Sequence, residues 1–253
     1  MYQLSCDVSF WASQNLKEAL AVADTLHINN IELSDIEGKA LEQCSGNEVE
    51  DIRNALIDSN KTIVLLNTDL PVTDTVSYNE LFRKAHLLHV QNVRIVLEKS
   101  LSDSEAITPD SASLAQILRM AELWNIGIVF ENNHASFFKD NDSMTAFLGK
   151  MPEHTALVFN PMEFVALQKH PFFHVFYNSK LKNRVRFLRL NDSLYSTGEA
   201  MPLAGGNGEI KELISILLSR SFDGYFSITP YREYSAVKML ETLEEYRSLL
   251  KNM

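Results

Sequence analysis

The chain has 253 residues, of which 45% are hydrophobic and 22% charged, a composition that suits one large globular domain. With 23 Lys and Arg against 33 Asp and Glu, its formal net charge is −10, which disfavours nucleic acid and anionic membrane surfaces as partners. No apolar run approaches the roughly 20 residues of a membrane-spanning helix, and the N-terminus has no apolar signal core. Only Cys6 and Cys44 are available for a disulfide, so we expect a cytoplasmic protein with reduced thiols.

Short apolar runs alternate with amphipathic segments along the whole chain. Helices are predicted where apolar residues recur at three- and four-residue steps. The predicted strands, in chain order, are 3–8, 30–33, 62–67, 93–98, 126–131, 155–160, 185–190 and 224–229. The predicted helices are 16–26, 48–57, 80–90, 113–124, 210–218 and 236–250. This alternation is typical of an α/β fold in which crossover helices join parallel strands.

The two faces of the predicted strands differ in bulk. In the fifth strand Gly127 shares a face with Glu131, whereas the opposite face carries Ile126, Ile128 and Phe130. The last strand repeats the pattern with Ser227 and Thr229 on the smaller face. A doubly wound sheet would have two equally bulky faces, but a barrel crowds small side chains inside and packs large ones against the helices. The sequence therefore predicts a single eight-stranded parallel (β/α)8 TIM barrel over residues 1–253.

Ligand chemistry in this fold is located at the carboxyl ends of the strands. When the same alternation is applied to every strand, a ring of inward-facing polar residues is predicted at that end. Its members are Asp7, Glu32, Asn67, Glu98, Glu131, Asn160, Arg189 and Thr229. The ring contains several carboxylates and a single cation, Arg189.

Several short motifs resemble one known family. Asn-Ile-Glu-Leu at 30–33 is similar to its second-strand Gly-Ile-Glu-Leu, and Glu-Asn-Asn-His at 131–134 resembles its fifth-strand Glu-Asn-His. The segment 203–210 resembles its Leu-Gly-x-Gly-x-Ile turn, and 224–229 resembles Gly-Tyr-x-Gly-x-Ile-Glu with Thr229 last. The family is the xylose-isomerase-like barrels of the sugar isomerase and epimerase superfamily, and the resemblance covers nearly the whole chain.

The resemblance implies one divalent ion held by a Glu, an Asp, a His and a second Glu. Glu131 matches the first of these ligands. Asn160 replaces the Asp, Arg189 replaces the His, and Thr229 replaces the second Glu, while Glu163 takes the place of a further His. An arginine offers only positively charged donors and would repel a cation, so we expect a degenerate site without metal.

The functional alternatives for the site residues remain open at this stage. Glu131, Arg189 and Glu32 are the candidate catalytic residues. Arg189 is expected to pair directly with Glu131, and it either only neutralises the acidic ring or holds an anionic oxygen of a ligand. The Gly-rich segment 205–208 is either a plain turn with Asn207 as a helix cap or an anion site. The candidate substrate-binding residues are Asn67, His134, Asn160, Asp192, Thr229, Gly206 and Gly208.

We interpret the chain as a sugar isomerase/epimerase-like barrel that binds or acts on a small carbohydrate-like or sugar-acid ligand. A first alternative is a working isomerase or epimerase in which Mn or Zn is bound by Glu131 with Glu32, Glu163 or Asp192. A second is a catalytically inactive scaffold or regulatory subunit. The aromatic stretch 170–177 is either packing on the barrel exterior or a lid or dimer contact, so a homodimer is one expected assembly.

Overall fold

A computed structural model describes residues 2–97, 111–136 and 138–253 of the chain. Eight parallel strands close into a barrel in the order β1-β10-β7-β6-β5-β4-β3-β2, which confirms the predicted (β/α)8 fold. The barrel strands are β1 (Gln3–Asp7), β2 (Asn30–Leu33), β3 (Thr62–Asn67), β4 (Asn92–Ile95), β5 (Gly127–Glu131), β6 (Ala156–Phe159), β7 (Val185–Leu190) and β10 (Tyr225–Ile228). A separate short hairpin pairs β8 (Asp192–Ser193) with β9 (Ala200–Met201).

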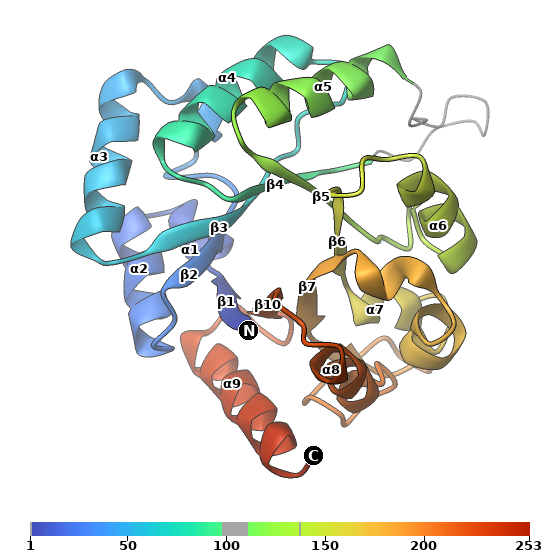
Figure 1. The fold of residues 1–253 in the computed structure, drawn as a ribbon. Coiled ribbons are helices and arrows are strands. Elements are labelled where there is room, and N and C mark those ends of the chain that lie inside the picture. The colour runs from blue at the N-terminus through green and yellow to red at the C-terminus, as the bar shows by residue number, and fades with distance from the viewer. Residues whose placement is uncertain (1, 98–110, 137) are drawn as a thin grey trace. The chain divides into compact units, whose positions relative to one another are not determined.

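The α-helices of the described residues follow the strands in alternation (Figure 1). They are α1 (Ser9–Ala12), α2 (Leu16–Thr25), α3 (Gly46–Asp58), α4 (Thr75–Leu87), α5 (Ala112–Leu123), α6 (Asn141–Gly149), α7 (Pro161–Val165), α8 (Ile210–Ser219) and α9 (Ala236–Lys251). The shorter helical turns are η1 (Leu41–Gln43), η3 (Pro171–Phe176) and η4 (Lys180–Asn183). No helix among the described residues is long and apolar enough to cross a membrane.

The strand predictions at 30–33, 62–67 and 185–190 match the observed bounds. The fourth strand ends at Ile95, and Glu98 lies outside the described residues. Helix α4 begins at Thr75, five residues before the predicted start at 80, because Asp74 Oδ1 accepts a hydrogen bond from Ser77 N at 3.1 Å. Helices α1, α6 and α7 were not predicted. Helices α1 and α7 have only four and five residues, too few to show a helical period, whereas α6 does show one in its buried residues Met144, Phe147 and Leu148.

The described residues form two compact units. The N-terminal unit comprises Ser5–Leu97 and 111–130, and the C-terminal unit comprises 2–4 and Glu131–Met253. In the N-terminal unit the strands β2 and β3 are almost fully buried, and α2, α3 and α4 flank them (Figure 1). Ile31, Ile63, Leu65 and Phe82 are among the side chains of this core that are inaccessible to solvent.

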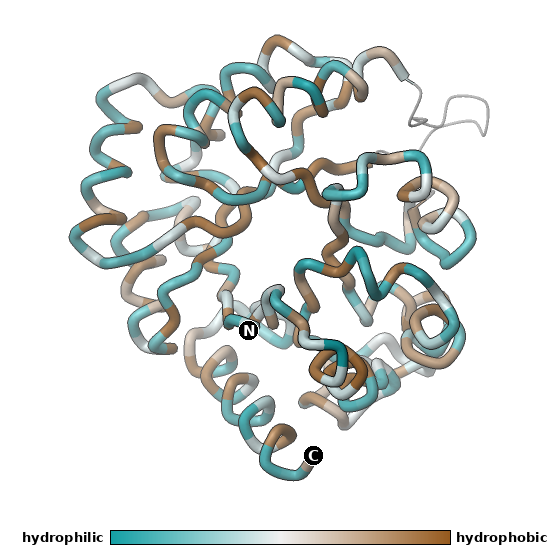
Figure 2. The backbone as a smooth tube through the Cα atoms, in the orientation of Figure 1, coloured by the Kyte–Doolittle hydropathy of each residue, from teal (hydrophilic) through white to brown (hydrophobic). Residues whose placement is uncertain are grey.

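The core of the C-terminal unit is built on β6, β7 and β10. Hydrophobic and hydrophilic residues alternate along its helices (Figure 2). In α8 the alternation buries Ile210, Leu213, Ile214 and Leu217, which recur at three- and four-residue steps. The helices therefore cover the strands with one apolar face each, as the predicted crossover pattern requires.

The aromatic stretch 170–177 forms η3, a single π-helical turn. Its first backbone N–H groups are held by the Glu209 carboxylate, which accepts hydrogen bonds from Phe172 N at 2.7 Å and Phe173 N at 3.2 Å. Phe176 is buried, whereas Phe173 and Tyr177 are exposed. The stretch is thus packed on one side and fastened to the start of α8, and its proposed role as a lid or dimer contact stays a prediction.

Candidate functional site

Glu131 and Arg189 form a direct ion pair in the C-terminal unit. Arg189 Nε donates to Glu131 Oε1 at 3.1 Å, and Arg189 Nη2 donates to Glu131 Oε2 at 3.3 Å. The two side chains are only 4% and 11% exposed, respectively. This forked, buried contact confirms the predicted pair and uses both carboxylate oxygens.

The register of β7 and β10 gives Arg189 its third partner. Arg189 lies opposite Ser227 in the parallel ladder, so both side chains project from the same face of the two strands. Arg189 Nη1 donates to Ser227 Oγ at 2.8 Å. Each nitrogen of the guanidinium therefore donates to a protein acceptor, and the predicted contact of Arg189 with a ligand stays a prediction.

Asn160 follows β6 and extends this network. Its Nδ2 donates to Glu131 Oε1 at 3.1 Å. The buried side chain of Asn132 fixes its backbone: Asn160 N donates to Asn132 Oδ1 at 2.8 Å, and Asn132 Nδ2 donates to Asn160 O at 2.9 Å. This two-bond clamp holds Asn160 where its side chain meets the ion pair.

The outermost member of the network is Asn191. Asn191 Nδ2 donates to Asn160 Oδ1 at 3.0 Å. Asn191 Oδ1 and Thr229 Oγ1 are buried atoms that have no hydrogen-bond partner within the described part of the chain. Buried polar atoms are nearly always paired, so these two need a partner such as a ligand or ordered water.

Asp192 contacts the Gly-rich segment that was considered as an anion site. Its carboxylate accepts hydrogen bonds from Ser193 N at 2.8 Å, Gly206 N at 3.0 Å and Gly208 N at 2.7 Å. A Cβ atom at Gly206 or Gly208 would lie 2.5 or 2.7 Å from Asp192 Oδ1, so only glycine permits this approach. An outside anion would have to displace the protein's own carboxylate from these amides.

Asn207 does not cap the following helix, contrary to the plain-turn interpretation of the segment. The N-cap of α8 is Glu209, whose φ of 50° is left-handed. Asn207 Oδ1 instead accepts a hydrogen bond from Tyr195 N at 2.9 Å, which ties the turn to the hairpin loop. The sequence could not show this because Tyr195 is distant along the chain.

His134 and Glu163 bind each other. His134 Nδ1 lies 2.6 Å from Glu163 Oε2, and His134 N donates to the same oxygen at 2.8 Å. The imidazole is about half exposed, with a side-chain exposure of 52%. Glu163, which one alternative assigned to a metal, is therefore engaged by the loop after β5. The substrate-binding role of His134 stays a prediction.

In the N-terminal unit, Glu32 is completely buried at the end of β2. Its Oε1 accepts a hydrogen bond from Ser5 Oγ of β1 at 2.6 Å, consistent with the Ser5 to Asn30 and Asp7 to Glu32 register. Cys6 lies on the opposite face of β1 and is buried, and burial raises the pKa of its thiol well above the ordinary value.

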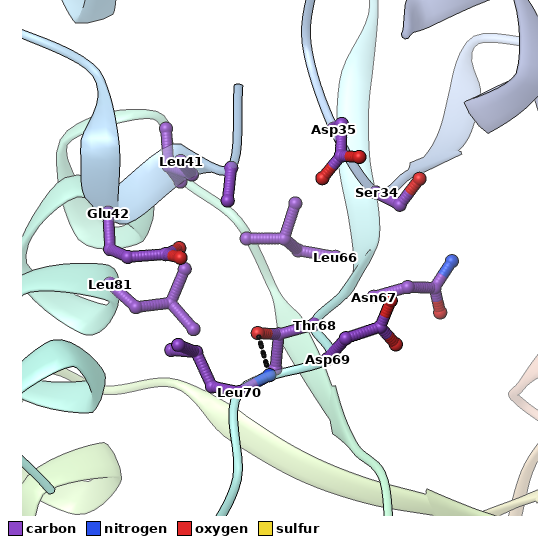
Figure 3. A pocket seen from close by; sticks show the side chains of 11 residues that line it. Ser34, Asp35, Leu41, Glu42, Leu66, Asn67, Thr68, Asp69, Leu70 and Leu81 are labelled. Carbon is purple, nitrogen blue, oxygen red and sulfur yellow. Dashed lines mark hydrogen bonds between the residues drawn. The ribbon is translucent and has the colours of Figure 1, made fainter. Parts of the chain in front are cut away.

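A pocket of about 210 Å³ lies in the N-terminal unit where β2 and β3 end (Figure 3). Asp35, Glu42, Leu66 and Asn67 are among the residues that line it. Burial raises the pKa of the Glu42 carboxyl, and the charge of Asp35 raises it further. Asn67 Oδ1 is buried without a hydrogen-bond partner among residues 2–97, 111–136 and 138–253. Asn67 also lines the pocket, but its binding role stays a prediction.

These residues do not fit the divalent ion that the motifs imply. Across the described ranges, no group of three or more His, Cys, Asp and Glu side chains is arranged to hold a metal ion. Both oxygens of Glu131 accept hydrogen bonds, and a guanidinium lies against them. A cation brought to Glu131 would meet the positive charge of Arg189 at short range.

Comparison with known proteins extends these observations. The fold and its polar strand ends define a (β/α)8 barrel, and specifically the fold of the xylose isomerase-like TIM barrels. The chain is similar to a D-tagatose 3-epimerase-like protein (15% identity, TM-score 0.75), with 99% of this chain and 98% of that chain covered. It is also similar to a xylose isomerase-like TIM barrel protein from Mycobacterium smegmatis in complex with magnesium. The identity is 16% and the TM-score 0.74, with 100% of this chain and 97% of that chain covered.

A third similar structure is the IolI protein with a bound zinc atom, at 14% identity and a TM-score of 0.74, with 99% of this chain and 98% of that chain covered. No family model and no curated protein matches the sequence. At these identities the likeness establishes the fold alone. The chemistry must be argued from the residues of this chain.

Sequence reasoning did not include Ser227, Asn132 and Asn191 among the site residues. Two of them carried a usable signal. Asn191 lies two residues after Arg189, and Ser227 lies two residues before Thr229, so each shares a strand face with a residue of the predicted ring. Asn132 had no such signal because it acts on the backbone of a segment 28 residues away.

Proposed function

We propose that the protein is a sugar isomerase/epimerase-like barrel that binds a small carbohydrate-like or sugar-acid ligand at the carboxyl ends of its strands, without a divalent metal ion. The network of Glu131, Asn160, Arg189, Asn191 and Ser227 supports this proposal. A barrel end that needed only stability could be filled with apolar side chains, because buried ion pairs contribute little net stability over such packing. Buried polar atoms that lack partners point instead to binding.

The exclusion of metal from this proposal rests on the side chains at the strand ends. The guanidinium of Arg189 supplies the positive charge beside Glu131, so the pair is close to neutral without any ion. Elemental analysis of dialysed protein should find no stoichiometric magnesium, manganese, zinc or cobalt. One tightly held ion per chain would favour the metal-dependent alternative.

Isomerisation or epimerisation of a carbohydrate is the second candidate function. The fold likeness to a protein named D-tagatose 3-epimerase-like favours it. Such a reaction moves a proton between positions on the carbon chain and needs a carboxylate that can accept it. Both oxygens of Glu131 already accept hydrogen bonds from a guanidinium or an amide, so a substrate proton would have to compete with these donors. We therefore propose binding as the primary property.

The experiment that tests this function is a ligand screen on the complete protein. Sugars, sugar acids and sugar phosphates at millimolar concentration are compared by thermal shift, and each hit is measured by isothermal titration calorimetry. At least one compound should raise the Tm, because a ligand that binds only the folded state stabilises it. If every compound leaves the Tm unchanged and produces no binding heat, the scaffold alternative becomes the better interpretation.

A further inference from the structure

We infer that η3 and the adjoining face of α8 form a docking surface for a short acidic segment of another protein, which places one apolar side chain against Phe172 and Phe173. The surface shares no residue with the network around Glu131 and Arg189. The inference therefore goes beyond the proposed function and does not depend on it.

An open hollow beside exposed aromatic side chains marks this docking surface. The hollow has a volume of about 340 Å³, and its lining residues are Phe172, Lys211, Glu212, Ser215, Ile216 and Ser219. Phe173 and Tyr177 are 65% and 51% exposed. The ring of Tyr177 lies against that of Phe172, with 5.5 Å between their centroids. Exposed aromatic side chains that gather around a hollow in this way are typical of surfaces that bind another protein.

The aromatic turn is held in a fixed arrangement before any partner binds. Glu209 Oε2 accepts hydrogen bonds from the backbone N–H groups of Phe172 and Phe173. The other carboxylate oxygen of Glu209 lies 3.2 Å from His170 Nδ1. Tyr177 N donates to Phe172 O at 2.8 Å, and this five-residue spacing is rare and frequent at functional sites. Because the turn is already ordered, a partner that contacts it pays little entropy for ordering this chain.

The charge of the docking surface is opposite to that of the chain as a whole. Residues 164–191 hold six of the 23 Lys and Arg residues and none of the 33 Asp and Glu residues. Lys182 Nζ donates to Tyr177 O at 2.6 Å, which places an ammonium group beside the aromatic turn. Lys211 adds a second ammonium group at the hollow, where Glu212 is the only carboxylate among the lining residues. These cations favour a partner that carries negative charge.

Three kinds of partner can be compared by their charge. A nucleic acid or an anionic membrane is an extended polyanion, which the net charge of −10 repels at long range. A second copy of this chain, related by a two-fold axis, would bring the same basic surface against itself. A short acidic segment meets only the local positive charge and inserts its apolar side chain beside the aromatic turn. The acidic segment is therefore the partner that fits this surface.

The test begins with a phage-displayed library of random dodecapeptides, selected against the complete protein. Enriched peptides should carry Asp or Glu around one Phe, Trp, Leu or Ile. Each peptide is then synthesised with a fluorescent label, and its Kd is measured by anisotropy. Phe173→Ser should weaken binding about fivefold or more, as loss of an interface anchor does. Lys211→Glu should weaken it as well and make the Kd less sensitive to salt.

Two variants in the N-terminal unit serve as matched controls. Val76 is an exposed apolar residue of α4, so Val76→Ser repeats the loss of an exposed apolar side chain. Lys17 is exposed and is the second residue of α2, as Lys211 is of α8, so Lys17→Glu repeats the charge change at an equivalent helix position. Both controls should leave the Kd unchanged. All four variants should keep the wild-type Tm, because each changes an exposed side chain.

The inference is overturned if no acidic peptide is enriched, or if the enriched peptides bind Phe173→Ser and Lys211→Glu as tightly as they bind the wild type. Two further measurements identify other occupants. Sedimentation velocity detects a dimer, and anisotropy with a labelled oligonucleotide or co-sedimentation with phosphatidylserine vesicles detects binding to a polyanion. A dimer or a polyanion complex that is lost in Phe173→Ser would overturn the inference and assign the surface to that partner.

Discussion

Replacing Arg189 by methionine should destabilise the protein strongly, because the substitution leaves a buried carboxylate without its counter-charge. Two unit charges about 4 Å apart interact by about 4 kcal/mol at an effective dielectric constant near 20. The contact between Arg189 Nε and Glu131 Oε1 is shorter, at 3.1 Å, and the two side chains are only 4% and 11% exposed. Loss of one partner from such a pair typically costs about 3–5 kcal/mol of unfolding free energy.

The assay is urea unfolding of wild type, Arg189→Met, Glu131→Gln and the double variant. We expect Glu131→Gln to cost less than Arg189→Met, because a glutamine oxygen can still accept from the guanidinium. The double variant should cost less than the sum of the two single variants by at least about 1.5 kcal/mol, since each single variant already destroys the same contact.

The surface pair Arg247 and Glu244 serves as the control. Its two side chains lie 2.5 Å apart but are 45% and 61% exposed. Arg247→Met should therefore change the unfolding free energy by about 0–1 kcal/mol. If Arg189→Met changed it no more than Arg247→Met does, the argument that burial makes the Arg189–Glu131 contact a structural element would be wrong.

Three further outcomes are expected. Manganese or zinc chloride should leave the Tm unchanged, and so should EDTA; a metal-dependent rise would contradict the poor fit of Glu131 to a cation. Asp192→Asn should lower the unfolding free energy in urea by about 1.5–3 kcal/mol, because a charged acceptor of three backbone N–H groups is lost. An unchanged urea midpoint would show that the turn at Gly206 does not depend on the charge of Asp192. Cys6 should react with a thiol reagent at pH 8 only on unfolding, because its raised pKa keeps the folded thiol protonated; rapid labelling of the native protein would show that it is accessible.

The barrel could be predicted from the sequence because it depends on local periodicity. Strands of four to six residues alternate with amphipathic helices, and the strand face that bears small residues also bears Glu131 and Ser227. The ion pair could be predicted for the same reason, since Glu131 and Arg189 end equivalent strands with the same side-chain direction. Both the barrel and the ion pair could thus be predicted because side chains alternate between the two faces of a strand.

Contacts made by loops could not be predicted in this way. The Gly-rich segment looked like an anion site because its backbone N–H groups had no visible partner in the sequence. That partner, Asp192, precedes Gly206 by 14 residues and returns to it through the β8–β9 hairpin. His134 and Glu163 likewise meet across 29 residues. Such contacts depend on loop geometry, which leaves no periodic trace.

The direction of the hydrogen bonds in the site follows from one residue type at one position. The residue is Glu131, because an ionised carboxylate has only acceptors and therefore requires the amide nitrogen of Asn160 to point towards it. The carbonyl oxygen of Asn160 is then turned towards the amide nitrogen of Asn191, which leaves the carbonyl oxygen of Asn191 as the last group. Arg189 supplies only donors to the same carboxylate, so the contact that makes a cation a poor fit beside Glu131 is compatible with this single direction of hydrogen bonds.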